Sequence, residues 1–164
     1  MIVASDRHTG FERFFLAQQP RLVAIALGWT GDRETAREAA QEALVRAHRE
    51  WERVGNLDRP DAWVRRGLVN LLIDRRRTLR RDVALLQRLG PPPVVDAVTF
   101  DDRRWWNAVR SLPDRQRAVV TLYYLEDLPV AEVAEILEMA PGTVKSTLSQ
   151  ARAALRRVLG KDVE

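Results

Sequence analysis

The chain has 164 residues, enough for one ordinary domain or two small ones. Hydrophobic residues make up 46% of it and charged residues 30%, a balance typical of a folded protein rather than a disordered one. The absence of cysteine excludes disulfides and cysteine-based zinc sites, and the two histidines, His8 and His48, show no metal-ligand spacing. The formal net charge of +4 favours a polyanionic partner, either nucleic acid or an acidic membrane surface.

The N-terminal sequence MIVASDRHTGFERF lacks the basic start and apolar run of a signal peptide. No stretch approaches the ~20 apolar residues that span a membrane. We therefore expect a cytoplasmic protein without membrane insertion.

Apolar residues recur at helical spacing through the first half of the chain. Residues 11–28 predict a helix that Pro20 is expected to kink or divide. Residues 33–53 predict the clearest helix, with alanines along one face and charges on the others. A further helix is expected from Asp61 to about Arg81.

Residues 82–101 differ in character, because three consecutive prolines follow Gly90 and no amphipathic period spans the segment. Residues 102–160 are helical again in pattern, and no strand pattern occurs anywhere. We therefore predict an all-α protein of two small helical domains, residues 10–81 and residues 102–160, joined by a linker over residues 82–101.

The stretch LPVAEVAEILEMAPGTVKSTLSQARAALRRVL, residues 128–159, predicts a helix-turn-helix. Its second helix begins at Pro141, a favoured first position, and an apolar stripe at Val144, Leu148, Ala151 and Leu155 faces the core. The other faces carry hydroxyls, an amide and cations, which suit phosphates and base edges in a major groove. An ordinary helical hairpin with a solvated polar face explains the periodicity equally well.

The particular residues favour the first interpretation. AEVAEIL, a three-residue turn and PGTVKSTLSQARAALR, preceded by LPDRQRAVVTLYYLEDLPVAEVA, resemble the promoter-binding domain of extracytoplasmic-function (group 4) sigma factors of the sigma-70 family, most like the actinobacterial ones. Three positions depart from the family pattern: Glu138 replaces a turn glycine, and Thr147 and Gln150 replace arginines. The resemblance implies that the −35 promoter element is contacted by Thr143, Lys145, Ser146, Thr147, Ser149, Gln150, Arg152 and Arg156.

The segment RETAREAAQEALVRAHREW, residues 33–51, resembles the family's helix that docks on the largest clamp subunit of RNA polymerase. Ala39 stands where the family has an aspartate. A charged, solvated surface is the alternative interpretation of this helix. The resemblance implies polymerase contacts by Arg37, Glu38, Gln41 and Glu42.

The segment DAWVRRGLVNLLIDRRRTLRR, residues 61–81, resembles the family's helix for the −10 element. Its arginines would bind phosphates, which makes binding salt-dependent, and the preceding loop is where the family holds a base flipped from the stack. Trp63 could stack on an unpaired base, although a helical tryptophan beside an apolar stripe is more often a core residue. The residues implied in −10 binding and melting are Asn56, Asp58, Trp63, Arg65, Arg66, Asn70, Arg76 and Arg77.

The resemblance implies a sigma factor that binds core RNA polymerase and directs promoter-specific transcription initiation. Promoter DNA is its second expected partner, and control is expected from an anti-sigma factor or from expression level. Because the sequence ends soon after the last predicted helix, an additional C-terminal regulatory domain is not expected.

Other functions explain less of the sequence. A stand-alone helix-turn-helix DNA-binding transcription regulator would account for residues 102–160 and leave the first half unexplained. A helical protein-interaction module without a DNA role is a second alternative. No catalytic triad, glycine-rich phosphate loop or metal cluster is evident, so we expect no enzyme activity, cofactor, metal or small-molecule substrate.

Overall fold

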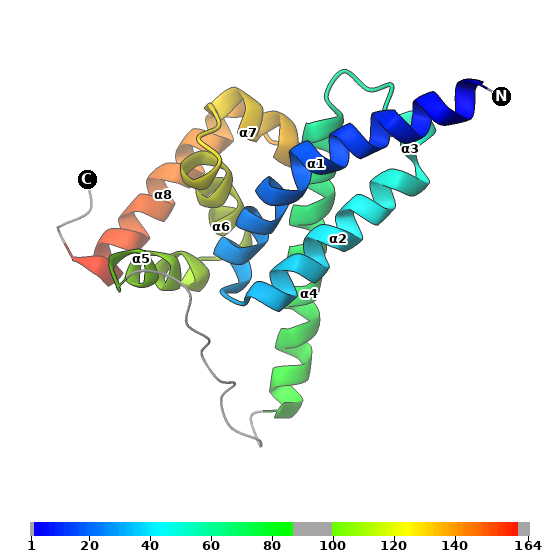
Figure 1. The fold of residues 1–164 in the computed structure, drawn as a ribbon. Coiled ribbons are helices and arrows are strands. Elements are labelled where there is room, and N and C mark those ends of the chain that lie inside the picture. Colours follow the sequence, from blue (N-terminus) through cyan, green and yellow to red (C-terminus); the bar gives the residue numbers. More distant parts are fainter. Residues whose placement is uncertain (1, 87–99, 161–164) are drawn as a thin grey trace.

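The structure is a computed structural model that describes residues 2–86 and 100–160 (Figure 1). Every regular element in these residues is helical, which confirms the all-α fold class. In chain order the elements are α1 (Ile2–Thr30), α2 (Arg33–Arg49), α3 (Trp51–Val54), α4 (Pro60–Leu86), α5 (Phe100–Ser111), α6 (Asp114–Val120), the π-helix η1 (Thr121–Leu125), α7 (Val130–Leu137) and α8 (Pro141–Leu159).

Helix α1 continues through Pro20, so the expectation that this proline divides the helix is wrong. Pro20 lies on the exposed side of α1, whereas Leu22 and Ile25 just after it are fully buried. Packing of those residues holds the following turns in place, although proline removes one backbone hydrogen bond. The helix also begins well before residue 11, where we expected it to begin.

The predicted helix over residues 33–53 is two helices. Asp32 caps α2 by accepting a hydrogen bond from the backbone N–H of Thr35 at 2.8 Å, and α2 ends at Arg49. The chain then turns so that the Trp51 ring packs against Phe11 and Phe14, at centroid distances of 5.3 and 4.9 Å. These aromatic contacts with α1 account for the break, since they require Trp51 to leave the line of α2.

The alanine face of α2 is buried as predicted, and its members are Ala36, Ala39, Ala40, Ala43, Leu44 and Ala47. Small side chains let α2 approach α1 and α4 closely. Helix α4 contributes Leu68, Val69 and Leu72 to the same core. Together with the short α3, these three helices form the N-terminal unit.

The C-terminal unit contains the predicted helix-turn-helix, formed by α7 and α8. Val144, Leu148, Ala151 and Leu155 of α8 are all buried, which confirms the predicted apolar stripe. Residues 121–125, which follow α6 directly, are π-helical. Helix occupies both ends of the predicted linker, since α4 reaches Leu86 and α5 begins at Phe100, and residues 87–99 lie outside the described residues.

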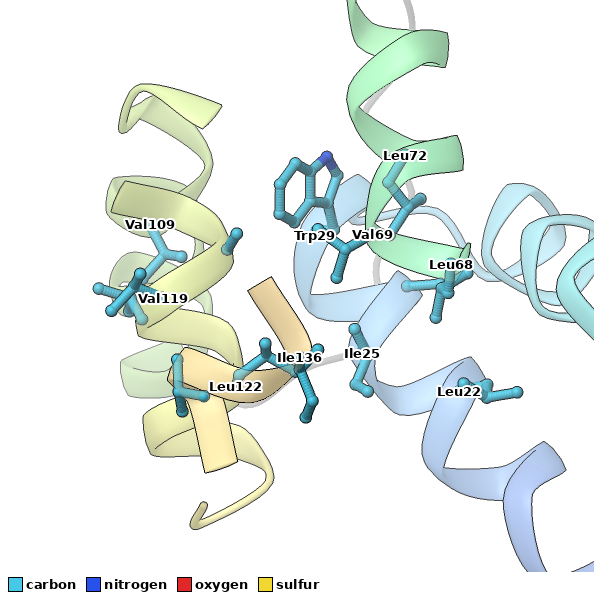
Figure 2. Packing of buried hydrophobic residues seen from close by; sticks show 14 of the residues in the cluster. Leu22, Ile25, Trp29, Leu68, Val69, Leu72, Val109, Val119, Leu122 and Ile136 are labelled. Atoms are coloured by element: carbon cyan, nitrogen blue, oxygen red, sulfur yellow. The ribbon is translucent and has the colours of Figure 1, made fainter. Parts of the chain in front are cut away.

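The two units pack against each other through one continuous apolar core. Figure 1 shows α5 to α8 on one side of α1 and α4, with α2 on the other side. Figure 2 shows Ile25 and Trp29 of α1 facing the elements that carry Leu122 and Ile136. The approach is close at Gly28, where an added Cβ would lie 3.0 Å from the Trp106 ring of α5. This packing decides which charged side chains of α4 meet the C-terminal unit.

Candidate nucleic-acid and polymerase interfaces

The polar face of α8 lies opposite its buried stripe and is largely exposed. Its exposed members among the predicted −35 residues are Thr143, Lys145, Ser146, Ser149, Gln150 and Arg156. The Ser146 hydroxyl donates to the Thr143 carbonyl at 3.0 Å. Two basic residues, Arg156 and Arg157, lie in the last turn, where they complement the helix dipole. These side chains can reach a DNA groove without any rearrangement of the C-terminal unit.

Thr147 differs from the other predicted −35 residues because only 6% of it is exposed. It lies three residues after Val144 and four before Ala151, so it borders the apolar stripe. That spacing was available in the sequence and indicates a packing role. We therefore omit Thr147 from the candidate DNA-contacting surface.

Arg152 is held against the π-helix. Its Nε donates to the Tyr124 hydroxyl at 2.7 Å, and its guanidinium carbon lies 5.7 and 5.8 Å from the Tyr123 and Tyr124 ring centroids. The hydrogen bond to Tyr124 is the main cause of a raised Arg152 pKa. The side chain is thus fixed at the edge of the polar face of α8.

Arg65 of α4 is buried, with 1% of the residue exposed. Its guanidinium donates to the carboxylate of Asp61 at 2.8 Å and to that of Glu126, beyond the end of η1, at 3.1 Å. The Glu126 side chain is itself 8% exposed. In this arrangement Arg65 does not reach the surface, contrary to the position that the −10 assignment requires.

Arg66 also points at the C-terminal unit. It donates to the backbone carbonyls of Ile136 at 2.9 Å and Glu135 at 2.8 Å, and it pairs with the carboxylate of Glu138 at 2.9 Å. Two of these acceptors belong to the last turn of α7, whose free carbonyls attract cations. Arg66 thereby stabilises the end of a helix that is distant in sequence.

Arg59, which the sequence analysis did not single out, joins the same contact from the loop before α4. It donates to Asp61 at 3.1 Å and to Glu132 of α7 at 2.9 Å, and Glu135 lies 3.6 Å away. Hydrogen bonds to Asp61 and Glu132 are the main causes of a raised Arg59 pKa. The hydrogen bonds from Arg59 are in turn the largest cause of a lowered Asp61 pKa. Neither partner in α7 is predictable from local spacing.

Arg76 donates to the backbone carbonyl of Leu112 at 2.9 Å and to the Asp114 carboxylate at 2.7 Å. Burial is the main cause of a lowered Arg76 pKa. Arg77 is exposed and lies 4.0 Å from Asp74 on its own helix. Of these two predicted −10 residues, Arg77 is exposed and Arg76 is half-buried.

The other predicted −10 residues lie around the loop before α4. Asn56 and Asp58 are exposed, and the Asn56 amide donates to the Glu52 carbonyl at 2.6 Å. Trp63 is half-buried, with the Arg53 guanidinium 5.6 Å from its ring. Asn70 is exposed on α4.

The candidate polymerase-docking residues lie on α2. Arg37, Glu38 and Gln41 are exposed, and the Glu42 carboxylate accepts hydrogen bonds from Arg46 at 2.6 Å and Arg75 at 3.0 Å. Burial raises the Glu42 pKa, but the hydrogen bonds from Arg75 and Arg46 outweigh it and lower that pKa overall. A groove between α2 and α4 adjoins this carboxylate, lined by Glu42, Arg46, Leu71, Asp74, Arg75, Thr78 and Leu79.

Within residues 2–86 and 100–160, no group of three or more histidine, cysteine or acidic side chains could hold a metal ion. In that part of the chain, no helix is both long enough and apolar enough to cross a membrane.

A helix-turn-helix with an exposed polar second helix, joined to a unit with an arginine-rich helix, defines a class of two-domain helical DNA-binding proteins. Family models assign residues 14–82 to sigma-70 region 2 and residues 102–155 to sigma-70 region 4. The chain is 31% identical to the RNA polymerase sigma-E factor of Streptomyces coelicolor over 151 residues, which are 91% of this chain and 85% of that protein. It is 32% identical to the ECF RNA polymerase sigma factor SigM of Mycobacterium tuberculosis over 96% of this chain and 81% of that protein. The chain therefore belongs to the extracytoplasmic-function sigma factors, as the resemblance predicted.

Two solved structures share the fold. The sigma factor RpoE of Bartonella quintana, crystallised with the anti-sigma factor NepR, matches with a TM-score of 0.74 and 23% identity over 93% of this chain and 98% of that one. The protein CnrH, in complex with the cytosolic domain of CnrY, matches with a TM-score of 0.69 and 20% identity over 99% and 97% of the two chains. At these identities the likeness supports the fold.

Proposed function

We propose that this protein binds core RNA polymerase and directs it to specific promoters. The observation that carries the proposal is the exposed polar face of α8, which a buried apolar stripe holds in a helix-turn-helix on a sigma-family chain. The face offers Lys145 and Gln150 for base edges and hydroxyls and arginines for phosphates. We assign it to the −35 element.

The N-terminal unit would supply the other two contacts. The exposed side of α2, with Arg37, Glu38 and Gln41, is our candidate surface for the clamp subunit of the polymerase. Helix α4 and the loop before it are our candidate for the −10 element, where binding the unstacked strand more tightly than the duplex would melt the promoter. The protein would act without a catalytic site or cofactor, in the cytoplasm, where its polymerase and DNA partners lie.

Sigma factors of this fold are known in complex with anti-sigma factors, as in the Bartonella quintana structure. An anti-sigma factor is therefore a candidate partner for this chain too.

Co-elution with core RNA polymerase on a sizing column, followed by transcription from genomic DNA, tests the function. We expect a stable complex and a limited set of discrete transcript starts. The variant Glu38→Arg should weaken the complex, whereas Glu12→Arg, an exposed reversal of equal charge on α1, should not. A chain that never binds core polymerase, yet binds DNA as a stable dimer, would instead be a stand-alone helix-turn-helix regulator.

A further inference from the structure

Several arginines of the N-terminal unit pair with carboxylates of the C-terminal unit, and four of them, Arg59, Arg65, Arg66 and Arg76, are here called the arginine row. The exposed Arg80 also lies 3.6 Å from Asp114. Each member of the arginine row pairs with at least one carboxylate of the C-terminal unit. Those carboxylates form the carboxylate row, which comprises Asp114, Glu126, Glu132, Glu135 and Glu138. Three members of the arginine row are also residues implied in contacting the −10 element.

Carboxylates and phosphates present the same chemistry to an arginine. Both offer paired anionic oxygens to the planar fork of the guanidinium, so one arginine satisfies either partner in the same way. In Arg65, Nε and one terminal nitrogen both donate to Glu126, while the other terminal nitrogen donates to Asp61. Each of the three guanidinium nitrogens therefore donates to a carboxylate, and because only 1% of Arg65 is exposed, a phosphate cannot reach it while the two units remain packed.

We infer that the carboxylate row and the phosphates of a nucleic-acid strand compete for the arginine row, so that separation of the two units and strand binding by α4 are one coupled equilibrium. This inference rests on the proposed function, because it assigns the arginine row to DNA in the separated state. It goes further by identifying the internal competitor and the residues that form it.

The contact between the arginine row and the carboxylate row contains both a buried ion pair and partly exposed ones. Arg65 and Glu126 pair away from water, where removing one partner leaves the other charge unpaired at high cost. Arg59 and Arg66 are half-buried, so their ion pairs contribute less and weaken with salt. Strand phosphates can therefore displace the outer pairs before the buried pair separates.

Arg117 of α6 opposes the packing. It lies buried over the Trp29 ring, at 5.2 Å, and donates to the Trp29 carbonyl at 3.3 Å. Within the described residues its Nε has no hydrogen-bond partner. Burial is the largest cause of a lowered Arg117 pKa, and the charges of Arg76, Arg110 and Arg80 lower it further, whereas the Asp114 carboxylate partly offsets them. Separation of the units would expose the Arg117 guanidinium to water, which would relieve the free-energy cost of burying its charge.

Separation also exposes the apolar side chains that join the units, including Trp29 and Ile136. That cost explains why a short strand alone should shift the wild-type equilibrium only slightly, whereas a large partner that covers those surfaces would shift it further. Substitutions that weaken the carboxylate row should shift this equilibrium in the same direction as such a partner, toward separated units.

The test uses the full chain and the variant Glu126→Gln/Glu132→Gln. The control Glu34→Gln/Glu50→Gln makes the same change in net charge at exposed sites of the N-terminal unit, where Glu50 pairs with Arg53 of its own unit. The probe is a fluorescein-labelled dT20 strand, followed by anisotropy at low salt, and small-angle scattering gives the radius of gyration. Circular dichroism verifies that each variant is folded.

We expect the first variant to have a larger radius of gyration than the wild type and to bind dT20 about tenfold more tightly than the control, as follows if the open fraction rises about tenfold. The variant Glu132→Gln/Glu135→Gln removes only the outer partners of Arg59 and should tighten binding by less. This milder change keeps the inference testable even if loss of Glu126 impairs folding.

Two results would overturn the inference. In the first, both carboxylate-row variants keep the wild-type radius of gyration and bind dT20 like the control. In the second, the radius increases but the affinity for dT20 does not. Co-elution with core polymerase is measured on the same samples, and its failure with a normal response to dT20 would count against the proposed function alone.

Discussion

Helices α8 and α4 carry similar polar and basic side chains but present them differently. On α8, Lys145 and Gln150 face solvent, whereas on α4 Arg65 lies buried beneath Glu126. The face of α8 is fixed by an apolar stripe that packs within its own unit. The orientation of Arg65 depends on a carboxylate 61 residues later in the chain. A candidate DNA-contacting face can thus be exposed or covered by ion pairs, depending on whether the residues that position it are near or distant in sequence.

The prediction with the largest expected effect concerns the buried apolar stripe of α8, which holds the polar face of that helix in place. Leu155 is 1% exposed, and Leu155→Ala should lower the free energy of unfolding of the C-terminal unit by about 2–5 kcal/mol. Val158→Ala, on the same helix but largely exposed, should change it little. Chemical denaturation followed by circular dichroism measures both. Equal losses for the two variants would show that the stripe does not hold the face in place.

Two positions on α8, the exposed Gln150 and the buried Thr147, sharpen the distinction between exposed and buried side chains. Gln150→Ala should lower affinity for a promoter fragment selected from genomic DNA, and a bidentate contact to adenine is worth about 1–3 kcal/mol. Thr147→Val, which keeps the shape of a buried side chain, should leave that affinity unchanged. Fluorescence anisotropy with the holoenzyme measures both. A loss at Thr147 with none at Gln150 would reverse our assignment of the face.

Asp61 tests the α4 side, because it accepts hydrogen bonds from both Arg59 and Arg65. Asp61→Asn should cost about 1.5 kcal/mol of stability at neutral pH, as is typical of a hydrogen bond to a charged group. The folded protein lowers the Asp61 pKa below its ordinary value of 3.8, so this stabilisation is present above pH 3.8 and is lost as pH falls through the folded pKa.

The difference in stability between wild type and Asp61→Asn should therefore shrink as the pH is lowered from 5 through that range. Urea denaturation at a series of pH values measures it. A difference that stays constant down to acid would mean that the carboxylate charge does not hold the two arginines.

Periodicity predicted the parts of this molecule that depend on local spacing. The alanine face of α2 and the stripe of α8 follow from apolar residues three and four apart, and the structure confirms both. The same rule could have identified Thr147 as a packing residue, since it borders that stripe. Chemical type alone suggested a DNA contact there.

The remaining features depend on tertiary contacts that no local pattern encodes. Arg65 reads in the sequence as one of several surface arginines, and only the placement of Glu126 makes it a buried ion pair. Arg59 was overlooked for the same reason, because its partner Glu132 lies on α7. Pro20 indicated a break in α1, yet neighbouring buried residues keep the helix continuous.

Glu138 lies in the turn between α7 and α8 and pairs with Arg66 of α4, and its substitution is the one from which we expect the smallest effect. Glu138 closes α7 in the left-handed region, with φ 52° and ψ 44°, a conformation that costs a residue with a side chain about 1 kcal/mol and costs glycine little. Glu138→Gly should therefore raise the free energy of unfolding of the C-terminal unit by about 0.5–1 kcal/mol. The lost pair with Arg66 subtracts little, because the Glu138 side chain is 71% exposed.

Glu135→Gly is the matched control, since it introduces the same residue inside α7, where glycine lowers stability by about 1 kcal/mol. The two variants should shift the thermal midpoint in opposite directions. If Glu138→Gly is destabilising as well, the ion pair with Arg66 contributes more than the backbone strain costs. The outer contacts of the arginine row would then hold the two units together more strongly than their exposure indicates.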